Sequence, residues 1–467
     1  MNMNPANTNT TDDDHVNAAA DDDDCHDLIL GQWERQHLEW SAKQGRILTD
    51  SGNALRYYSR ENGFPFVPSE LPHYYLERGD SDIVFKQWAK IMKDKQYTSP
   101  IIGVWDRPIF AGRWEHTTNE DEIVYNVQTA TLFVDLRIPR SKPVMNWEKL
   151  LKHPQQQHVH DLHSSRQEEA FQSMSGQDLR MFARQHVFGG FSLLSTMEGD
   201  VTHACPTEHH RSLLCCTRHH CIDWNYIPRK PRPRPNKWYI DMLLSKDDEE
   251  SASNSNTTSV GKSPLPSCNV WKELSYSTDE NGQCYYYEIW KRRIGDKRGE
   301  GLRLAMRRKR NRELDVVGGD DNIDGIFVVV GDHFNYILGR TSRRHENKYY
   351  HVANLVELVD TAIEHGDRET AISYLSLDGG HGTISSGWKI DCSIQPWHHG
   401  MRVFDRIGGD GGVKVVVESS GDDCDFFAWD ITIGNSSWEI YECSVGTAIE
   451  LEILLNHNGD DNSRSRL

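Results

Sequence analysis

Long apolar segments are missing from this sequence of 467 residues. Its longest uninterrupted run of aliphatic and aromatic residues, from Ile326 to Val330, has five residues, whereas a membrane-spanning helix requires about 20. The first residues, MNMNPANTNTTDDD, also lack the basic start and apolar core of a signal peptide. We therefore expect no membrane span and a cytoplasmic location, with the nucleus as an additional one. The ten cysteines are then expected to be reduced thiols.

Apolar residues are scarce overall, at 37% against the usual figure of about 45–50%, and the formal net charge is −18. Even so, the 14 Trp, 17 Tyr and 14 Phe exclude a wholly disordered chain, because disordered segments contain few aromatic residues. Residues 1–28 hold eight Asp and no Lys or Arg, which predicts a disordered acidic tail. The sequence therefore indicates a folded, aromatic-rich body with polar appendages.

The spacing of apolar residues changes at about residue 100. Between 29 and 99 they recur at helical spacing, as in Ile83, Trp88 and Ile91, and predict a short helical extension. Beyond it, short aromatic and β-branched runs with period two predict a mainly β, antiparallel sandwich or barrel. We expect a β-barrel domain at 100–345 with a disordered insertion at 245–267. At 346–460 we expect a helix and strands that complete a second barrel or the same one.

Four local patterns complete this prediction. The apolar spacing around Leu355 and Val359 predicts one or two helices near 352–376. The stretches GIFVVVGDHFNYILGR (325–340) and IELEILLN (449–456) have the composition of strands, and LDGGHG (377–382) has that of a turn.

Several of these runs together resemble a known family. They are, in order, VQTATLFVDLRIPR, ARQHVFGGF, YYYEIWKRR, GIFVVVGDHFNYILGR and WKIDCSIQPW. Their succession over roughly 105–400 resembles a poorly characterised lipocalin-like (calycin-type) family, related to a fungal casein-kinase-interacting protein with tandem calycin-like barrels. The resemblance implies one or two antiparallel calycin/lipocalin-like barrels and no established activity. The acidic tail, the 245–267 insertion and the His/Cys-rich segment depart from the family pattern.

Strand alternation gives the candidate binding site. On each of three strands, aromatic residues share one face with carboxylates or arginine. These candidate ligand-binding residues are Phe133, Asp135 and Arg137; Tyr286, Glu288 and Trp290; and Asp332 and Tyr336. If these faces line a calycin barrel, they could stack a planar ligand and bind its polar end through Arg137 or Glu288. In the alternative, the faces point to solvent and Asp135 and Arg137 form an exposed pair.

Histidine and cysteine crowd residues 203–221, but the spacing does not match a zinc finger, and adjacent strand residues point to opposite faces. We therefore predict no metal site, no catalytic residue and no identifiable cofactor. A rival hypothesis is a barrel enzyme or haem binder that uses His186 or His333 as a base or axial ligand.

Two basic clusters, PRKPRPRP (228–235) and WKRRIGDKRGEGLRLAMRRKRNRE (290–313), could bind phosphate, an acidic partner or an import receptor. No nucleic-acid motif accompanies them, so nucleic acid is not favoured as a partner. The alternative is that their Lys and Arg residues alternate outward on edge strands.

The sequence therefore favours a non-enzymatic, intracellular calycin-like binding or adaptor protein that holds a small apolar or amphipathic ligand in a barrel. The first alternative is a protein-interaction scaffold with a filled barrel, whose partner would be a protein such as a kinase. The second alternative is a barrel enzyme or a haem or metal binder.

Overall fold

The computed structural model describes residues from 101 to 456, apart from several segments within that range. The segments left out are 113–115, 141–168, 197–213, 228–235, 243–268, 276–285, 294–300, 309–323, 341–347, 350–351, 353, 409–411 and 418–428. The predicted acidic tail (1–28), helical extension (29–99) and insertion (245–267) lie outside the described residues.

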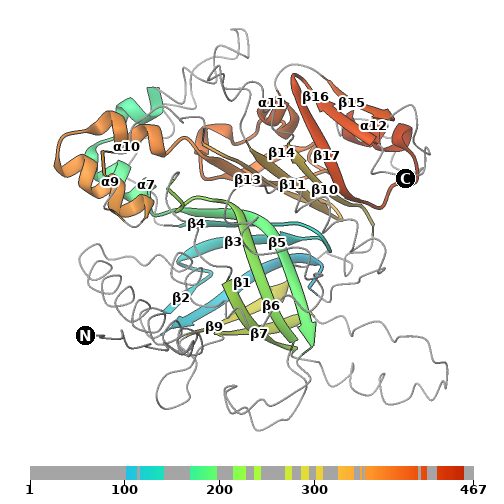
Figure 1. Ribbon diagram of the computed structural model, residues 1–467, viewed down its shortest axis with the longest axis horizontal. Coiled ribbons are helices and arrows are strands. Elements are labelled where there is room, and N and C mark those ends of the chain that lie inside the picture. Colours follow the sequence, from blue (N-terminus) through green and yellow to red (C-terminus); the bar gives the residue numbers. More distant parts are fainter. Residues whose placement is uncertain are drawn as a thin grey trace, which may run out of the picture.

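The first sheet closes on itself. Its strands are β1 (Gly103–Gly112), β2 (His116–Thr118), β3 (Glu122–Gln128), β4 (Phe133–Pro139), β5 (His186–Thr196), β6 (Leu214–Asp223), β7 (Asn236–Met242), β8 (Val270–Ser275) and β9 (Tyr286–Arg292). From β3 to β9 each strand pairs with the next antiparallel strand, and β1 pairs with both β3 and β9. The eight strands other than β2 therefore form a barrel (Figure 1).

The second sheet is open and also antiparallel. It contains β10 (Arg303–Arg308), β11 (Gly325–Val330), β12 (His333–Leu338), β13 (Asp378–Thr383), β14 (Lys389–Ser393), β15 (Val413–Val417), β16 (Trp429–Ile433) and β17 (Ser436–Cys443). Its order is β14-β13-β12-β11-β10-β17-β16-β15, so β14 and β15 are its edges. The chain passes from the first sheet to the second between Arg292 and Arg303. This crossing lies within residues 100–345, the range expected above to form one β-barrel domain.

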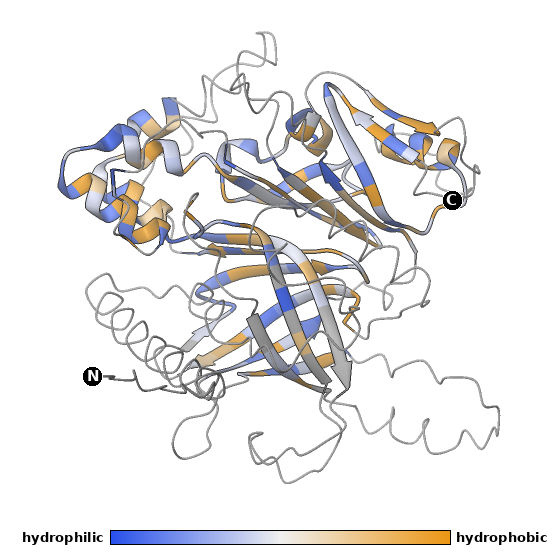
Figure 2. Ribbon diagram, in the orientation of Figure 1, coloured by the Kyte–Doolittle hydropathy of each residue, from blue (hydrophilic) through white to orange (hydrophobic). Residues whose placement is uncertain are grey.

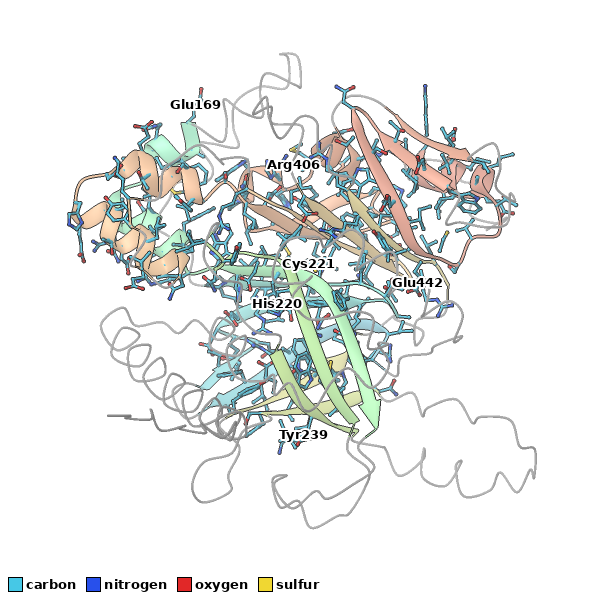
Figure 3. The ribbon with its side chains drawn as sticks, in the orientation of Figure 1. Glu169, His220, Cys221, Tyr239, Arg406 and Glu442 are labelled. Atoms are coloured by element: carbon cyan, nitrogen blue, oxygen red, sulfur yellow. The ribbon has the colours of Figure 1, made fainter. Side chains whose placement is uncertain are left out.

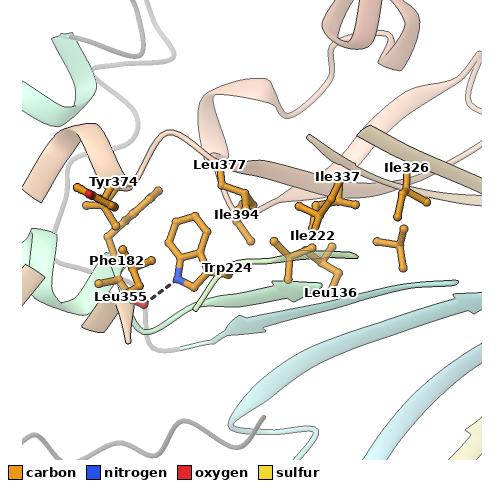
Figure 4. Close-up of a cluster of buried hydrophobic side chains, with 14 of the residues drawn as sticks. Leu136, Phe182, Ile222, Trp224, Ile326, Ile337, Leu355, Tyr374, Leu377 and Ile394 are labelled. Atoms are coloured by element: carbon orange, nitrogen blue, oxygen red, sulfur yellow. Dashed lines mark hydrogen bonds between the residues drawn. The ribbon is translucent and has the colours of Figure 1, made fainter. Parts of the chain in front are cut away.

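The two sheets pack against each other through apolar side chains. On β4, Val134 and Leu136 point away from the barrel interior, into a core that they share with Ile326 and Ile337 of the second sheet. Figure 4 shows Leu136 facing Ile337. At Gly379 on β13, an added Cβ would lie 2.8 Å from a methyl group of Val187 on β5, so the close approach of the layers requires glycine there. Strands of both layers carry apolar residues (Figure 2), and β11 is buried along its whole length.

Helices close one end of the junction. They are α7 (Gly176–Phe182), α9 (Leu355–Glu364) and α10 (Arg368–Tyr374). Helices α9 and α10 confirm the prediction of one or two helices near 352–376. Arg184, just after α7, pairs with Asp360 in the middle of α9 at 2.8 Å. The indole nitrogen of Trp224 donates to the Ala183 oxygen at 2.8 Å (Figure 4). Side-chain caps at Asn354 and Asp367 begin α9 and α10.

The concave side of the second sheet is filled. Two further helices, α11 (Val403–Gly408) and α12 (Ala448–Asn456), place apolar side chains against it. The aromatic rings of Phe327, Phe334, Trp388 and Phe404 meet in this core. The fold is therefore mainly β, with two antiparallel sheets and few helices, as the sequence predicted.

Three local predictions were wrong. The stretch 325–340 is not one strand, because Gly331 (φ 60°) and Asp332 form a two-residue turn between β11 and β12. LDGGHG is not a turn, because its residues 378–382 lie in the buried strand β13, where glycine permits close packing. The stretch 449–456 is not a strand: it lies in α12, where Leu451 and Leu455, spaced i and i+4, are buried.

Candidate functional site

Six of the eight predicted site residues point into the barrel. Phe133, Asp135 and Arg137 lie on β4, and Tyr286, Glu288 and Trp290 lie on β9; each is at most 2% exposed. An Arg137 guanidinium nitrogen lies 3.8 Å from Glu288 Oε2. Because β3 and β1 separate these two strands, this ion pair has to cross the barrel interior. The solvent-facing alternative for Asp135 and Arg137 is therefore wrong.

The other two predicted residues lie elsewhere. Asp332 is in the turn between β11 and β12, where its carboxylate accepts hydrogen bonds from the backbone and hydroxyl of Ser385. Tyr336 faces the concave core of the second sheet and donates to Asp378 Oδ2 at 3.1 Å. Neither reaches the barrel, because β11 and β12 both belong to the second sheet.

Further charged residues complete a network inside the barrel. Arg137 Nε lies 3.0 Å from Asp135 Oδ1, and Arg218 on β6 lies 3.6 Å from Asp135 Oδ2. Arg107 on β1 pairs with Glu288 at 3.2 Å and with Glu122 at 2.5 Å. Sequence reasoning missed Arg107 and Arg218. The alternation that selected Arg137 would have found them, since Arg107 shares a strand face with Trp105 and Arg218 with Cys216.

Aromatic rings fill the space between these charges. The rings of Trp271 and Trp290 stack at 5.4 Å between centroids, and Trp105 meets Trp271 edge-on at 5.8 Å. The Arg218 guanidinium lies 4.2 Å from the ring centroid of Phe133 and 4.7 Å from that of Trp238. Such cation–π contacts and ion pairs stabilise an arginine away from water.

One inward carboxyl group favours its neutral form. Glu273 on β8 accepts hydrogen bonds from the Tyr286 hydroxyl at 3.0 Å and the Trp290 indole at 3.2 Å. Burial, and then the neighbouring charge of Glu288, raise the pKa of Glu273 well above its ordinary value. A neutral acid here limits the number of negative charges that the inward arginines have to balance.

Three inward side chains have polar atoms without a hydrogen-bond partner in the part of the chain that the structure describes. These side chains are Asn126, Trp238 and Trp271. The atoms without a partner are both amide atoms of Asn126, which is 0% exposed, and the two indole nitrogens. An unsatisfied buried polar group costs about 1–3 kcal/mol. These atoms are therefore the places where a polar ligand would gain most inside the barrel.

The two histidines of the rival hypothesis lie apart. His186 Nε2 is 3.3 Å from Asp223 Oδ1, and His220 Nδ1 is 2.8 Å from Asp223 Oδ2. Burial alone would raise the pKa of Asp223, but the hydrogen bonds from His186 and His220 outweigh it and hold this pKa below its ordinary value. His333 is instead at the junction, where its ring centroid lies 5.4 Å from that of His381.

Two cysteines of the His/Cys-rich segment have described side chains, and they lie in different cores. Cys216 joins the barrel core with Trp238, whereas Cys221 packs into the core between the layers. In Figure 3, Cys221 lies beside the second sheet and Tyr239 lies on the far side of the barrel. Residues 203–213 are outside the described range. Within that range, no group of three or more His, Cys, Asp or Glu side chains could hold a metal ion.

The second basic cluster does not lie on edge strands, so that alternative was wrong. Its strands β9 and β10 each pair on both sides. Arg292 lies over the Trp105 ring at 4.4 Å, and Arg307 forms a buried pair with Asp324 at 2.9 Å. These two arginines are therefore part of the core and unavailable to phosphate. The first cluster (228–235) and residues 294–300 and 309–313 of the second fall outside the described part of the chain.

Comparisons with known proteins give one similar solved structure and no matching family. No protein-family model matches the chain, and no curated protein matches it. Among solved structures, the chain is similar to the uncharacterised protein YLR301w from Saccharomyces cerevisiae. The alignment covers 73% of this chain and 98% of that one, at 10% identity and a TM-score of 0.34. So low a score carries no argument about function. Among the residues described, no helix is long and apolar enough to cross a membrane.

Proposed function

We propose that this chain is a non-enzymatic adaptor protein whose barrel is a filled structural core and whose binding takes place on its outer surface. The observation that carries the proposal is the ion pair between Arg137 and Glu288 across the barrel. Together with the Trp271 and Trp290 stack, it occupies the space in which a hollow calycin barrel holds its ligand.

The strand order supports membership of the calycin group. Eight antiparallel strands pair largely in chain order, and the last closes on the first, which is the up-and-down arrangement of lipocalin barrels. The resemblance noted in the sequence, to a family related to a casein-kinase-interacting protein, makes a protein kinase the first class of partner to test.

Native mass spectrometry of the chain isolated from its own cells tests this function. The adaptor proposal predicts a retained protein and no small molecule released on denaturation. A small molecule retained in proportion to the chain would overturn the filled barrel. A chain that retains neither protein nor small molecule at any salt concentration would contradict the adaptor role.

A second candidate function, binding of a small planar ligand inside the barrel, is favoured by one observation. Asn126, Trp238 and Trp271 present buried polar atoms without partners in the described structure. A ligand with hydrogen-bond acceptors could satisfy both indole N–H groups while it stacks on the tryptophans.

Replacing Asn126 by Leu distinguishes the two functions. In a filled barrel, the change removes an unsatisfied amide and should raise the free energy of unfolding by about 1 kcal/mol. In a ligand site, it should abolish retention of the small molecule. The matched control is Asn119→Leu, in an exposed turn, which should change neither stability nor ligand retention.

A further inference from the structure

The edge strand β15 of the second sheet is covered by side chains instead of by another strand. On its inner side β15 pairs with β16. On its outer side, the backbone N–H of Val413 donates to Asn456 Oδ1 at 3.1 Å, and that of Val415 donates to Glu452 Oε2 at 2.8 Å. The Asn456 amide nitrogen returns a hydrogen bond to the Val413 oxygen at 2.8 Å. Both acceptor side chains belong to α12.

The geometry of helix and strand explains why two side chains suffice. Outward N–H groups of alternate strand residues repeat every ~6.7 Å. Residues i and i+4 of a helix are separated by ~6 Å along its axis. Glu452 and Asn456 are such a pair, and they meet Val415 and Val413 in antiparallel order. The side chains of α12 therefore reproduce the hydrogen bonds of a missing neighbouring strand.

Helix α12 is also tied to the opposite edge of the same sheet. Trp388, next to β14, donates its indole N–H to the Leu454 oxygen at 3.2 Å, and Arg402 donates to the Leu455 oxygen at 2.7 Å. Trp388 has a φ of 63°, a conformation that costs energy for so bulky a residue. It is 0% exposed and packs against Phe404. Helix α12 thus makes contacts at both edges, β14 and β15, of the open sheet.

The strand beneath α12 has a sequence suited to pairing with itself. It reads Val-Lys-Val-Val-Val, and β-branched residues favour strands. An edge strand with free N–H and C=O groups pairs readily with another chain, and proteins often cover such an edge with a helix. Antiparallel pairing of two identical strands is symmetric and therefore closes as a dimer.

We propose that α12 is an edge guard, and that the β15 edge beneath it is a strand-pairing surface for β15 of a second copy of this chain. The outer face of α12 does not resemble that of a simple surface helix. Ile449 and Ile453, also spaced i and i+4, are 69% and 61% exposed. The period-two alternation of 449–456 is that of a strand, and the helix occupies the place of one. This inference does not depend on the proposed adaptor function.

The test removes the two guard side chains in the full chain. Glu452→Ala with Asn456→Ala should convert a monomer into a dimer, so that the mass measured by light scattering is twice that of the unaltered chain at the same protein concentration. The control Glu450→Ala, an exposed carboxylate on the same helix, should remain monomeric. Adding Val415→Pro to the double variant removes an outward N–H and should restore the monomer. A folded double variant that stays monomeric would overturn the proposal.

A second measurement on the unaltered chain does not require the variants to fold. Amide hydrogen exchange at Val413 and Val415 should be slower than at exposed amides by at least tenfold, because Asn456 and Glu452 hold these N–H groups. Exchange at the rate of exposed amides would show that the edge is open and would contradict the guard.

Discussion

The side-chain amide nitrogen of Asn335 on β12 lies 2.9 Å from the backbone oxygen of Val134 on β4, in the other sheet. The same nitrogen lies 2.9 Å from the Tyr125 oxygen, and Asn335 Oδ1 lies 2.8 Å from His381 Nδ1. Because the nitrogen donates to two carbonyl groups, the oxygen must accept from the histidine. One buried amide therefore joins the barrel to two strands of the second sheet.

Replacement of Asn335 by Ala should destabilise the whole chain. The change leaves the carbonyl groups of Tyr125 and Val134 buried without this donor, and we expect a loss of about 2–4 kcal/mol in the free energy of unfolding. Urea unfolding followed by tryptophan fluorescence measures it. Asn119→Ala, in an exposed turn, is the control and should change this free energy by less than about 0.5 kcal/mol. An equal, small effect of both variants would contradict a joining role for Asn335.

The junction should weaken in acid because of His381. Its ring stacks on Tyr125 at 3.9 Å between centroids. Burial, followed by the charges of His333 and Arg293, holds the pKa of His381 well below its ordinary value. Asp106 pairs with Arg293 on the barrel side, and Asp391 and Cys392 lie on the β14 side.

The folded state thus disfavours protonation of His381. Stability from this group is present above the unfolded pKa of about 6.5 and is lost as the pH falls below it, by at most ~1.4 kcal/mol per pH unit. His381→Gln should flatten the fall in unfolding free energy between pH 7 and pH 5. The exposed His399, replaced by Gln, is the control. Identical pH profiles for the wild type and His381→Gln would count against this account.

Glu273 should behave in the opposite sense. Its raised pKa means that the folded state favours the protonated acid. The contribution of Glu273 to the free energy of unfolding is therefore present below about pH 4 and is lost as the pH rises toward the folded pKa. Glu273→Gln should therefore become more stable relative to the wild type as the pH is raised from 5 to 8, although it loses one acceptor. Chemical unfolding at several pH values measures this change. A constant difference would mean that Glu273 is ionised in the fold.

Sequence pattern predicted the fold class because period-two alternation is local. It did not predict that β9 closes on β1, since Trp105 and Arg292 become partners only after the intervening strands have paired in order. It also misread 449–456, because alternation at period two leaves Leu451 and Leu455 on one face of a helix as well as on one face of a strand. Tertiary packing against β15 decided between them.

Strand alternation could not show which face of β4 points into the barrel, and the reason is physical. On β4 both faces are buried, since the second sheet covers Val134 and Leu136 while the barrel encloses Asp135 and Arg137. The usual rule that apolar residues face the core and polar ones face water does not apply to such a strand. The alternation grouped the residues of each face correctly, but only the packing of the two layers shows that the charged face is the inner one.

The central claim is that the barrel is filled by its own charged and aromatic side chains, and Arg137→Ala tests it most directly. The change leaves Asp135 and Glu288 buried without this partner, so we expect a loss of about 3–5 kcal/mol in the free energy of unfolding. Lys291→Ala, on the exposed face of β9, is the control and should leave the thermal transition unchanged. A lowered transition for Arg137→Ala alone, with no small molecule released from the wild type on denaturation, is the predicted result. An unchanged transition together with the loss of a small molecule that the wild type retains would contradict the account.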